Sequence, residues 1–233
     1  MIERPHQSAQ KAKGRPSGAE RTRETLVRAG LRLFGHKGFE ATSTREIAAE
    51  AGANIGSIAY HFGGKEGLRN ACADYIVETI SGIAQVALDD TAAPDARLAS
   101  PEASATVLRQ VVEAMVRFIV QRPEAEDVAQ FVMRELSQPT AALDTIYAGV
   151  FEPVHKRLCV LWEAATGEPA ESERTRITVF TLIGQVIYFR IAREAVRRRM
   201  EWRDIGQREA AAIVEVALGN LSTIINARRR GTS

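Results

Sequence analysis

The chain has 233 residues, 45% hydrophobic and 26% charged, a composition typical of a soluble protein with a substantial core. Its polar, basic N-terminus resembles no secretory signal, and we expect no segment apolar and long enough to cross a bilayer, which predicts a cytoplasmic protein. Two distant cysteines and four histidines without paired spacing argue against disulfides and metal sites, so no cofactor is predicted.

Charge is distributed unevenly along the chain. Residues 1–69 contain 12 Lys or Arg and 7 Asp or Glu, a net charge of +5, whereas the remainder of the chain carries −3. A positive N-terminal part on a mildly negative body fits a nucleic-acid-binding head. Differences of this size are also common between segments of ordinary proteins, so the asymmetry alone assigns no function.

Residues 1–18 lack apolar periodicity and predict a disordered basic arm. Within the arm, Gly14-Arg15-Pro16 resembles the core of an AT-hook, which can place Arg in a narrow A·T-rich minor groove. A solvated tail that only adds charge is the alternative interpretation.

Residues 19–64 predict three helices, the first from about Ala19 to His36. The segment Thr44–Ala51 has the apolar spacing of a short amphipathic helix, and Ser43 with Glu46 forms a capping box at its start. Gly52 can then adopt the left-handed conformation that ends this helix.

A third helix is expected from Ile55 to about His61, with Asn54 as its cap. Its outer face carries small and hydrogen-bonding side chains, and little on it is available for burial. A helix without bulk on its outer face, held by a tight turn against a rigid partner, suits insertion into a DNA major groove.

Many residues of this region occur in a characteristic order: Phe34, Gly38, Phe39, Thr42 to Ile47, Ala51-Gly52, Gly56, Ile58, His61-Phe62, Lys65-Glu66 and Leu68. In these residues the chain, over about positions 20–69, resembles the DNA-binding domain of the TetR family of bacterial transcriptional regulators. The family usually has Tyr where Ala59 stands, and here Tyr60 comes next. Either Tyr60 takes over part of the phosphate contact of that Tyr, or the DNA footprint differs.

The resemblance implies that base edges are read by the outer face of the third helix and by Arg45, since Arg to guanine is the commonest specific contact. The expected base-reading residues are Arg45, Asn54, Gly56, Ser57 and Tyr60. The expected phosphate contacts are Thr44, Tyr60, His61 and Lys65. Ordinary surface charge is the alternative for Arg45 and Lys65, and a structural role beside Phe62 is the alternative for His61.

Residues 65–228 predict a larger helical domain for effector binding and dimerisation. A helix from Lys65 to about Leu88 links it to the N-terminal domain, and the Asp-, Ala- and Pro-rich residues 89–103 predict a loop. Further helices are expected over Ser104–Arg122, Glu124–Ser137, Ala141–Thr166 with a kink or break at Pro153, Glu171–Arg199 and Gly206–Arg228. Strand-like alternation is absent, so the predicted fold class is all-α, with about nine helices.

The last two long helices are apolar on more than one face, which indicates contact with a second copy as well as with their own domain. We expect a homodimer through a four-helix interface, in which the small residue Gly184 allows close approach. The expected interface residues are Ile183, Gly184, Ile187, Ile191, Ala217, Leu221 and Ile224. Two heads would read a palindrome, whereas one recognition helix reads too few base pairs. Burial within one large domain is the alternative.

Residues 174–202, with Arg134-Glu135 upstream, resemble the C-terminal domain of the CecR (YbiH) or CerR-like subgroup of the same family. This implies a drug- or metabolite-responsive repressor with an unknown small-molecule effector in a mainly apolar cavity. The expected lining residues are Cys72, Ile76, Met115, Phe118, Phe131, Arg134, His155, Trp162, Gln185 and Tyr188. Each also fits a plain core position, and Arg134, His155 and Gln185 are favoured because buried polar groups need partners.

The sequence therefore predicts a homodimeric repressor that an effector releases from a palindromic double-stranded DNA operator. The helix beginning at Lys65 is expected to carry the effector's signal, because it touches the N-terminal domain and lines the cavity. A helical enzyme and an effector-independent DNA-binding protein are the alternatives. No nucleophile elbow, Walker loop or dinucleotide fingerprint supports an enzyme, although Arg134-Glu135 and His155 could share a pocket.

Overall fold

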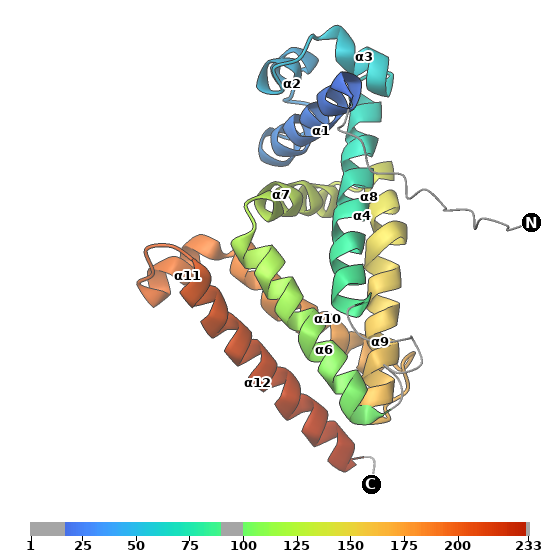
Figure 1. Ribbon diagram of the computed structural model, residues 1–233, viewed down its shortest axis with the longest axis vertical. Helices are drawn as coiled ribbons and strands as arrows, with labels where there is room; N and C mark the ends of the chain where they lie inside the picture. Colours follow the sequence, from blue (N-terminus) through green and yellow to red (C-terminus); the bar gives the residue numbers. More distant parts are fainter. Residues whose placement is uncertain (1–16, 90–99, 232–233) are drawn as a thin grey trace, which may run out of the picture.

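The computed structural model describes residues 17–89 and 100–231, and within these ranges it contains helices and no strand (Figure 1). The predicted all-α class is confirmed. The predicted AT-hook and most of the predicted loop, residues 90–99, lie outside the described residues. The predicted arm, residues 1–18, extends two residues too far toward the C-terminus, because Ser17 caps the first helix and Gly18 is its first residue.

Three helices form the N-terminal part, here called the head: α1 (Gly18–Lys37), α2 (Thr44–Glu50) and α3 (Gly56–Phe62). The predicted helices were right to within about a residue at each end. Local signals explain this accuracy, because capping boxes start α1 and α2, and glycines with positive φ follow them.

The rest of the chain, here called the body, begins with α4 (Lys65–Asp89), α6 (Pro101–Val116) and the π-helical segment η1 (Arg117–Gln121). It continues with α7 (Glu124–Ser137), α8 (Ala141–Ile146), the π-helical segment η2 (Tyr147–Phe151) and α9 (Glu152–Thr166). The chain ends with α10 (Glu173–Ile191), α11 (Arg193–Met200) and α12 (Gln207–Gly231).

Helix α6 begins three residues earlier than expected, because Ser100 accepts a hydrogen bond from the amide of Ala103 and Pro101 occupies the first turn. The predicted helix 141–166 is divided by η2, which ends two residues before Pro153; this proline has no amide hydrogen to continue the α-helical ladder. The predicted helix 171–199 is divided at Ala192, whose ψ of 25° departs from helical geometry.

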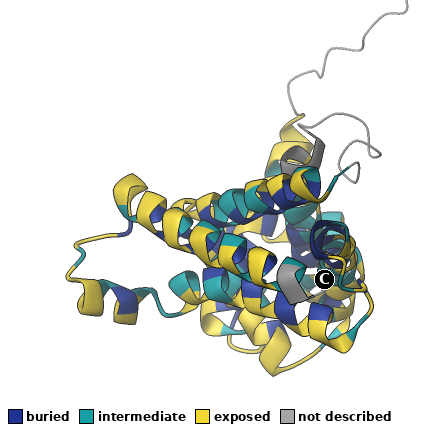
Figure 2. Cartoon of the chain, turned by 90° about the horizontal axis from the view of Figure 1, so that it is seen from below, coloured by how far each residue is buried: buried dark blue, intermediate teal, exposed yellow. Residues whose placement is uncertain are grey.

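Two hydrophobic clusters hold the chain together. One joins α6, η1, α9, α10, α11 and α12 around the fully buried Trp162. The other joins the three head helices to the first turns of α4 and also to α7 and α8, through Val128, Phe131, Ala142 and Ile146. Buried residues lie on the inner sides of the body helices and exposed residues on their outer sides (Figure 2). The head therefore shares its core with α7 and α8.

The sequence analysis expected no segment long and apolar enough to cross a bilayer. This expectation is wrong, because Gln207–Arg229 of α12 has the length and the composition that a membrane-spanning helix needs. Core helices of soluble proteins meet the same requirement, so this is weak evidence for a membrane span. One face of α12 packs into the body, alongside α6 (Figure 1). The side chains of that face are Ala210, Ile213, Ala217, Leu221 and Ile225.

Candidate nucleic-acid interface

The start of α2 is fixed by a reciprocal cap. The Ser43 hydroxyl accepts from the amide of Glu46 at 3.2 Å, and the Ser43 amide donates to the Glu46 carboxylate at 2.9 Å. The Lys37 ammonium, 2.9 Å away, adds a third partner. The amide of Ser43, then Lys37 and the Ser43 hydroxyl, lower the pKa of Glu46 from 4.5 to about 2. The helix that carries Arg45 is therefore held at its first turn.

The turn between α2 and α3 also depends on identified residues. Gly52 has a φ of 62°, in the left-handed region that favours glycine. The sequence predicts Asn54 as the cap of the third helix, but the cap position of α3 is Ile55, which makes no side-chain cap bond; the Asn54 side-chain oxygen accepts from the amide of Gly56 at 2.8 Å, within the turn. Because this oxygen already accepts a hydrogen bond, the side-chain NH2 group of Asn54 is the part that can contact a DNA base.

Gly67 has a role that the sequence analysis missed. A Cβ at this position would stand 1.8 Å from the carbonyl oxygen of Phe62 and 2.9 Å from its carbon. Both neighbours are backbone atoms that cannot move aside, so only glycine allows α4 to pass the end of α3 this closely. The angle between the recognition helix and α4 depends on this contact.

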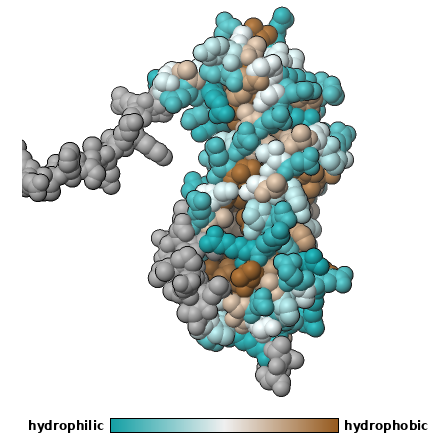
Figure 3. Space-filling view, turned by 90° about the vertical axis from the view of Figure 1, so that its right-hand side faces the viewer, coloured by the Kyte–Doolittle hydropathy of each residue, from teal (hydrophilic) through white to brown (hydrophobic). Residues whose placement is uncertain are grey.

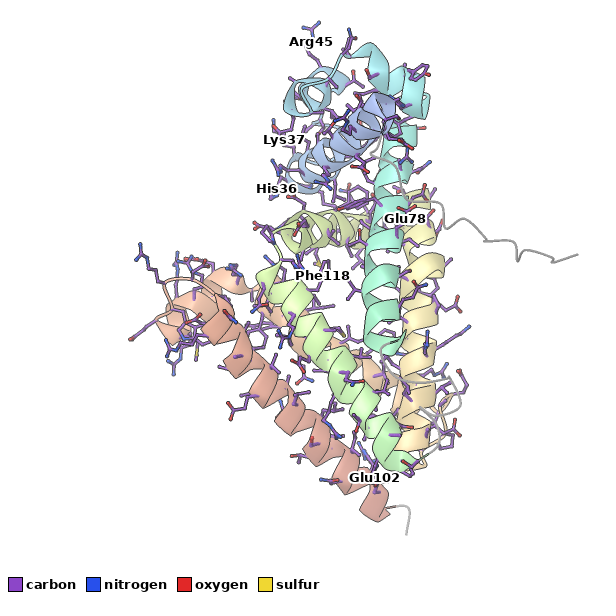
Figure 4. All side chains as sticks on the ribbon, in the orientation of Figure 1. His36, Lys37, Arg45, Glu78, Glu102 and Phe118 are labelled. Atoms are coloured by element: carbon purple, nitrogen blue, oxygen red, sulfur yellow. The ribbon has the colours of Figure 1, made fainter. Side chains whose placement is uncertain are left out.

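The outer face of the head carries the side chains that were predicted to bind DNA. Arg45 is exposed and projects from the end of the molecule away from the body (Figure 4). Tyr60 has 83% of its surface exposed, although tyrosine is a large apolar ring with one polar tip. Thr44, Ser57, His61 and Lys65 are partly exposed, and Asn54 and Gly56 are exposed.

Two of these residues are held by aromatic contacts. The Lys65 ammonium lies 4.2 Å from the centre of the Phe39 ring, so a cation–π contact orients it on the head surface. The edge of one ring meets the face of the other between Tyr60 and His61, with centroids 4.9 Å apart. Ala59, where the family usually has Tyr, is exposed, and so is Tyr60, which follows it.

Exposed Ile55 was not among the predicted contacts. It stands directly before α3 and is 50% exposed, beside Asn54 and Gly56. In the sequence it reads as a residue available for burial. Its exposure places an apolar side chain on the surface that carries Tyr60 and Asn54, where a thymine methyl group is a suitable partner.

The predicted effector residues fall into three groups by burial. Cys72, Ile76, Phe131 and Trp162 are fully buried, and burial raises the pKa of the Cys72 thiol, which therefore stays neutral. Met115, Phe118, His155 and Gln185 are half-buried, and Phe118 lies where α6 approaches α7 and α4 (Figure 4). Arg134 and Tyr188 are exposed. The predicted set therefore does not line one enclosed space.

Two of the favoured polar candidates have partners elsewhere. Arg134 donates to the carbonyl oxygens of Gly35 and His36, at the end of α1. His155 lies 3.2 Å from the carbonyl oxygen of Arg176, and its ring stacks on Phe180 with centroids 4.0 Å apart. The expectation that Arg134-Glu135 and His155 could share a pocket is wrong, because α7 and α9 hold them against different helices.

One hollow lies at the corner between α11 and α12. Its volume is about 630 Å³, and it is open to solvent. Arginines and carboxylates alternate along it: Arg197, Glu201, Trp202, Arg203, Asp204, Gly206, Arg208 and Glu209. A second hollow lies beside Gly206 and Arg117. Neither contains a residue that was predicted to bind an effector.

The predicted dimer residues are split between two faces. Gly184 and Ile191 are exposed, and Ile183, Ile187 and Ile224 are half-buried. Ala217 and Leu221 are buried inside the subunit, so for them the expected interface role is wrong. Hydrophobic spacing alone did not distinguish the inner face of α12 from its outer face.

A capped short helix that holds a second helix outward, with hydrogen-bonding and basic side chains around it, defines a helix-turn-helix DNA-binding protein. Residues 26–72 match the family model described as bacterial regulatory proteins, tetR family. Residues 105–228 match the model described as the C-terminal domain of the HTH-type transcriptional dual regulator CecR. The chain belongs to the TetR family of transcriptional regulators and has a CecR-type C-terminal domain.

Individual relatives agree with this assignment. The chain is 30% identical over 209 residues to the dual regulator CecR of Shigella flexneri, covering 88% of this chain and 92% of that protein. It is 29% identical over 147 residues to the repressor NicS of Pseudomonas putida, covering 60% and 64%. Both relatives are transcriptional regulators.

Solved structures share the fold. AibR in complex with isovaleryl coenzyme A and operator DNA superimposes with a TM-score of 0.63 at 18% identity, covering 85% of this chain and 96% of that one. A TetR-like regulator from Rhodococcus sp. RHA1 gives a TM-score of 0.60 at 18% identity, covering 89% and 99%.

Proposed function

We propose that the protein is a homodimeric repressor that binds a palindromic operator and leaves it when a small-molecule effector binds the body. The observation that carries the proposal is an apolar stripe on the outer face of α10, which the subunit itself leaves exposed. We call it the α10 stripe. Its residues are Ile177, Phe180, Gly184, Tyr188 and Ile191.

The spacing of the α10 stripe supports a helix as its partner. Its members follow one another by three or four positions, so they form one continuous line along the helix. Four of them are large hydrophobic side chains, each more than half exposed. Other large apolar residues, such as Tyr147 and Val160, also reach the surface of the body, where apolar patches are interrupted by polar residues (Figure 3).

A second copy is the partner that the DNA-binding role favours. One head presents a single recognition helix, and the affinity of such a unit for a few base pairs is too low to select sites in a genome. Two heads related by a two-fold axis double the contacts and read a palindrome. Only 28% of the apolar stretch of α12 is buried in the subunit, which supports its inclusion beside α10 in the interface.

Operator contacts are assigned to the exposed face of the head. Arg45, Asn54, Gly56, Ser57 and Tyr60 read bases, and Thr44, Tyr60, His61 and Lys65 hold phosphates. The exposure of Arg45 and Tyr60 supports this, since both side chains are free to meet a duplex at the end of the molecule (Figure 4). A cytoplasmic location is part of the proposal, because operator DNA lies in the bacterial cytoplasm.

The effector is assigned to the part of the body around Met115 of α6 and Phe118 of η1. Half-buried Met115 and Phe118 support this placement, because apolar side chains that are incompletely covered can gain contacts with an apolar ligand. An effector that prefers the conformation with mispositioned heads lowers operator affinity by its differential affinity for the two states. A second possibility is that the protein also activates transcription at some promoters, because its relative CecR is described as a dual regulator.

The experiment selects binding sites from a random double-stranded DNA library and determines the mass of the protein by sedimentation. We expect a palindromic consensus and twice the mass of one chain. A monomer, or a library without enrichment at moderate salt, overturns the proposal. A panel of small molecules then tests the effector, since a ligand raises thermal stability by mass action and should also release the selected site. Ligands that stabilise the protein without releasing the site favour the effector-independent alternative.

A further inference from the structure

The joint between head and body has a second attachment besides the continuous chain at α4. Helix α7 passes directly under α1, near its C-terminal end (Figure 1). At the crossing, a Cβ on Gly35 would lie 3.0 Å from the backbone nitrogen of Phe131 and 3.1 Å from Gln130. The two helices are therefore in near backbone contact, and they touch at a glycine.

Arg134 binds the end of α1 from this crossing. Its Nε donates to the carbonyl oxygen of Gly35 at 2.6 Å, and a terminal nitrogen donates to that of His36 at 2.8 Å. The last four carbonyl groups of a helix have no partner within the helix, and the helix dipole makes them attractive to a cation. The planar guanidinium of Arg134 thus satisfies two of these carbonyl groups at once.

The next residue reaches the other side of the joint. The Glu135 side chain is only 2% exposed, and one carboxylate oxygen accepts a hydrogen bond from Nε of Arg69 on α4 at 2.7 Å, while a terminal nitrogen of the same guanidinium forms an ion pair with that oxygen at 2.6 Å. Its second oxygen accepts from the hydroxyl of Thr140, the cap of α8, at 2.6 Å. Arg69 in turn lies 4.7 Å from the centre of the Phe39 ring in the head. A buried, fully partnered pair of this kind is costly to break on one side only.

A third contact between α7 and α1 is more exposed. Asp127 accepts from Arg32 at 3.3 Å and lies 3.2 Å from the His36 ring, at the end of α1 that faces α7 (Figure 4). Exposed ion pairs contribute little, so this contact adds to the joint without determining it.

We propose that Arg134 and Glu135, here called the α7 clamp, are positioning residues for operator binding. They touch no DNA, and they fix the angle of the head on the body so that the two recognition helices of a dimer match one half-site spacing. The signal of an effector then passes to the head through α7 as well as through α4. This inference rests on the proposed function.

The experiment measures how affinity depends on half-site spacing. The selected palindrome is prepared with its two half-sites moved apart or together by one to three base pairs, together with a duplex that carries one half-site. Wild-type protein should lose about tenfold or more in affinity when the spacing changes, because the second head no longer reaches its site. It should bind the single half-site weakly.

Arg134→Ala is the main variant, because Arg134 is exposed and its removal leaves the core intact. We expect its affinities for these half-site spacings to differ by threefold or less, with an unchanged affinity for the single half-site. Arg134→Lys keeps the charge without the planar fork and should fall between. Arg198→Ala is the matched control, since it removes an arginine that pairs with Glu194 on α11 and should keep the wild-type profile.

A second measurement covers variants that bind DNA too weakly for a spacing profile. A nitroxide label on Glu40→Cys, an exposed head position, reports the distance between the two heads of a dimer. The distance distribution should widen in Arg134→Ala and in Glu135→Gln and stay narrow in Arg198→Ala. Retention of both the wild-type spacing preference and the narrow distribution in Arg134→Ala overturns the clamp. A wild-type protein that is monomeric or indifferent to spacing overturns the proposed function instead.

Discussion

The outer faces of α3 and α10 lie in two regions of one molecule and expose opposite chemistry. On α3 the exposed side chains are small or hydrogen-bonding, apart from Tyr60 and the neighbouring Ile55. The α10 stripe exposes large apolar side chains from Ile177 to Ile191. Water solvates the first surface well and the second poorly, so the two surfaces favour different partners: a hydrated, charged duplex and another apolar helix.

The two surfaces also differ in how their binding free energies depend on salt. Contacts of the head with phosphates depend on salt, because they release counterions from DNA. Contacts along the α10 stripe depend on apolar area and change little with salt. Variants of the two surfaces should therefore be distinguishable by salt dependence as well as by size of effect.

The largest effect is expected from Gly184→Arg on the α10 stripe. A side chain at Gly184 meets nothing within 4 Å in the subunit, so the subunit should fold normally. In a close helix–helix interface the same side chain has no room and buries a charge. We expect a monomer by sedimentation and operator affinity reduced by about a hundredfold or more, since one head replaces two.

Gly82→Arg is the control for that prediction, because Gly82 also meets nothing within 4 Å and lies on α4. It should remain dimeric and bind the operator normally. If Gly184→Arg also remains dimeric, the α10 stripe is not the interface.

Arg45→Ala should give the next largest effect, confined to sequence preference. A bidentate contact between arginine and guanine contributes about 1–3 kcal/mol of discrimination. We expect the variant to lose selectivity at one base pair of each half-site, by about tenfold to a hundredfold, and to keep its affinity for random DNA. Binding to all single-base variants of the selected site measures this. Equal losses on all of them would assign Arg45 to the phosphates.

Lys65→Ala should act on every sequence alike and by less. Its ammonium lies against the Phe39 ring at the start of α4 and is partly exposed, a placement suited to a phosphate. We expect affinity to fall a few-fold on specific and random DNA, and the slope of log affinity against log salt to fall by about 0.9 per head. An unchanged slope would mean that Lys65 binds no phosphate and serves only in its contact with the Phe39 ring.

Sequence reasoning described the head closely because its signals are local. The pairing of Ser43 with Glu46 and the glycine after Ala51 define their turns within a few residues. The body depends on distant contacts. Arg134 was recognised as a polar residue in need of partners, yet those partners are carbonyl groups of α1, 98 and 99 residues away in the chain. A single sequence carries no trace of that pairing.

The division of the long helix at Ala192 was missed for a similar reason. Arg190 donates to the carbonyl oxygens of Ile119 and Arg122, and Arg193 donates to that of Val120. The break at Ala192 lets both arginines reach the end of η1. Helical periodicity continues across this position in the sequence, so only the tertiary contacts reveal the break. Pro153 was recognised, in contrast, because proline acts on its own helix.

The smallest effect on DNA binding is expected from a change at the cap of α2, which tests how the head holds Arg45 in position. The pKa of Glu46 is lowered to about 2, so its carboxylate stabilises the folded head fully above pH 4.5. That stability is lost as the pH falls from 4.5 toward 2, because in this range the unfolded state binds a proton that the folded state does not. Carboxyl titration by NMR should find Glu46 among the most acidic groups of the protein.

Ser43→Ala removes one accepting and one donating hydroxyl contact from this cap while leaving the amide of residue 43 in place. The pKa of Glu46 should therefore rise only part of the way to its ordinary value, and the loss of the cap should cost about 1 kcal/mol of stability. Ser17→Ala at the equivalent cap of α1 is the control, since it should raise the pKa of Glu20 and leave Glu46 unchanged. Because Arg45 lies one residue inside α2, operator affinity should fall about twofold in Ser43→Ala and stay constant in Ser17→Ala. Equal losses in both variants would mean that the cap acts on overall stability and not on the orientation of Arg45.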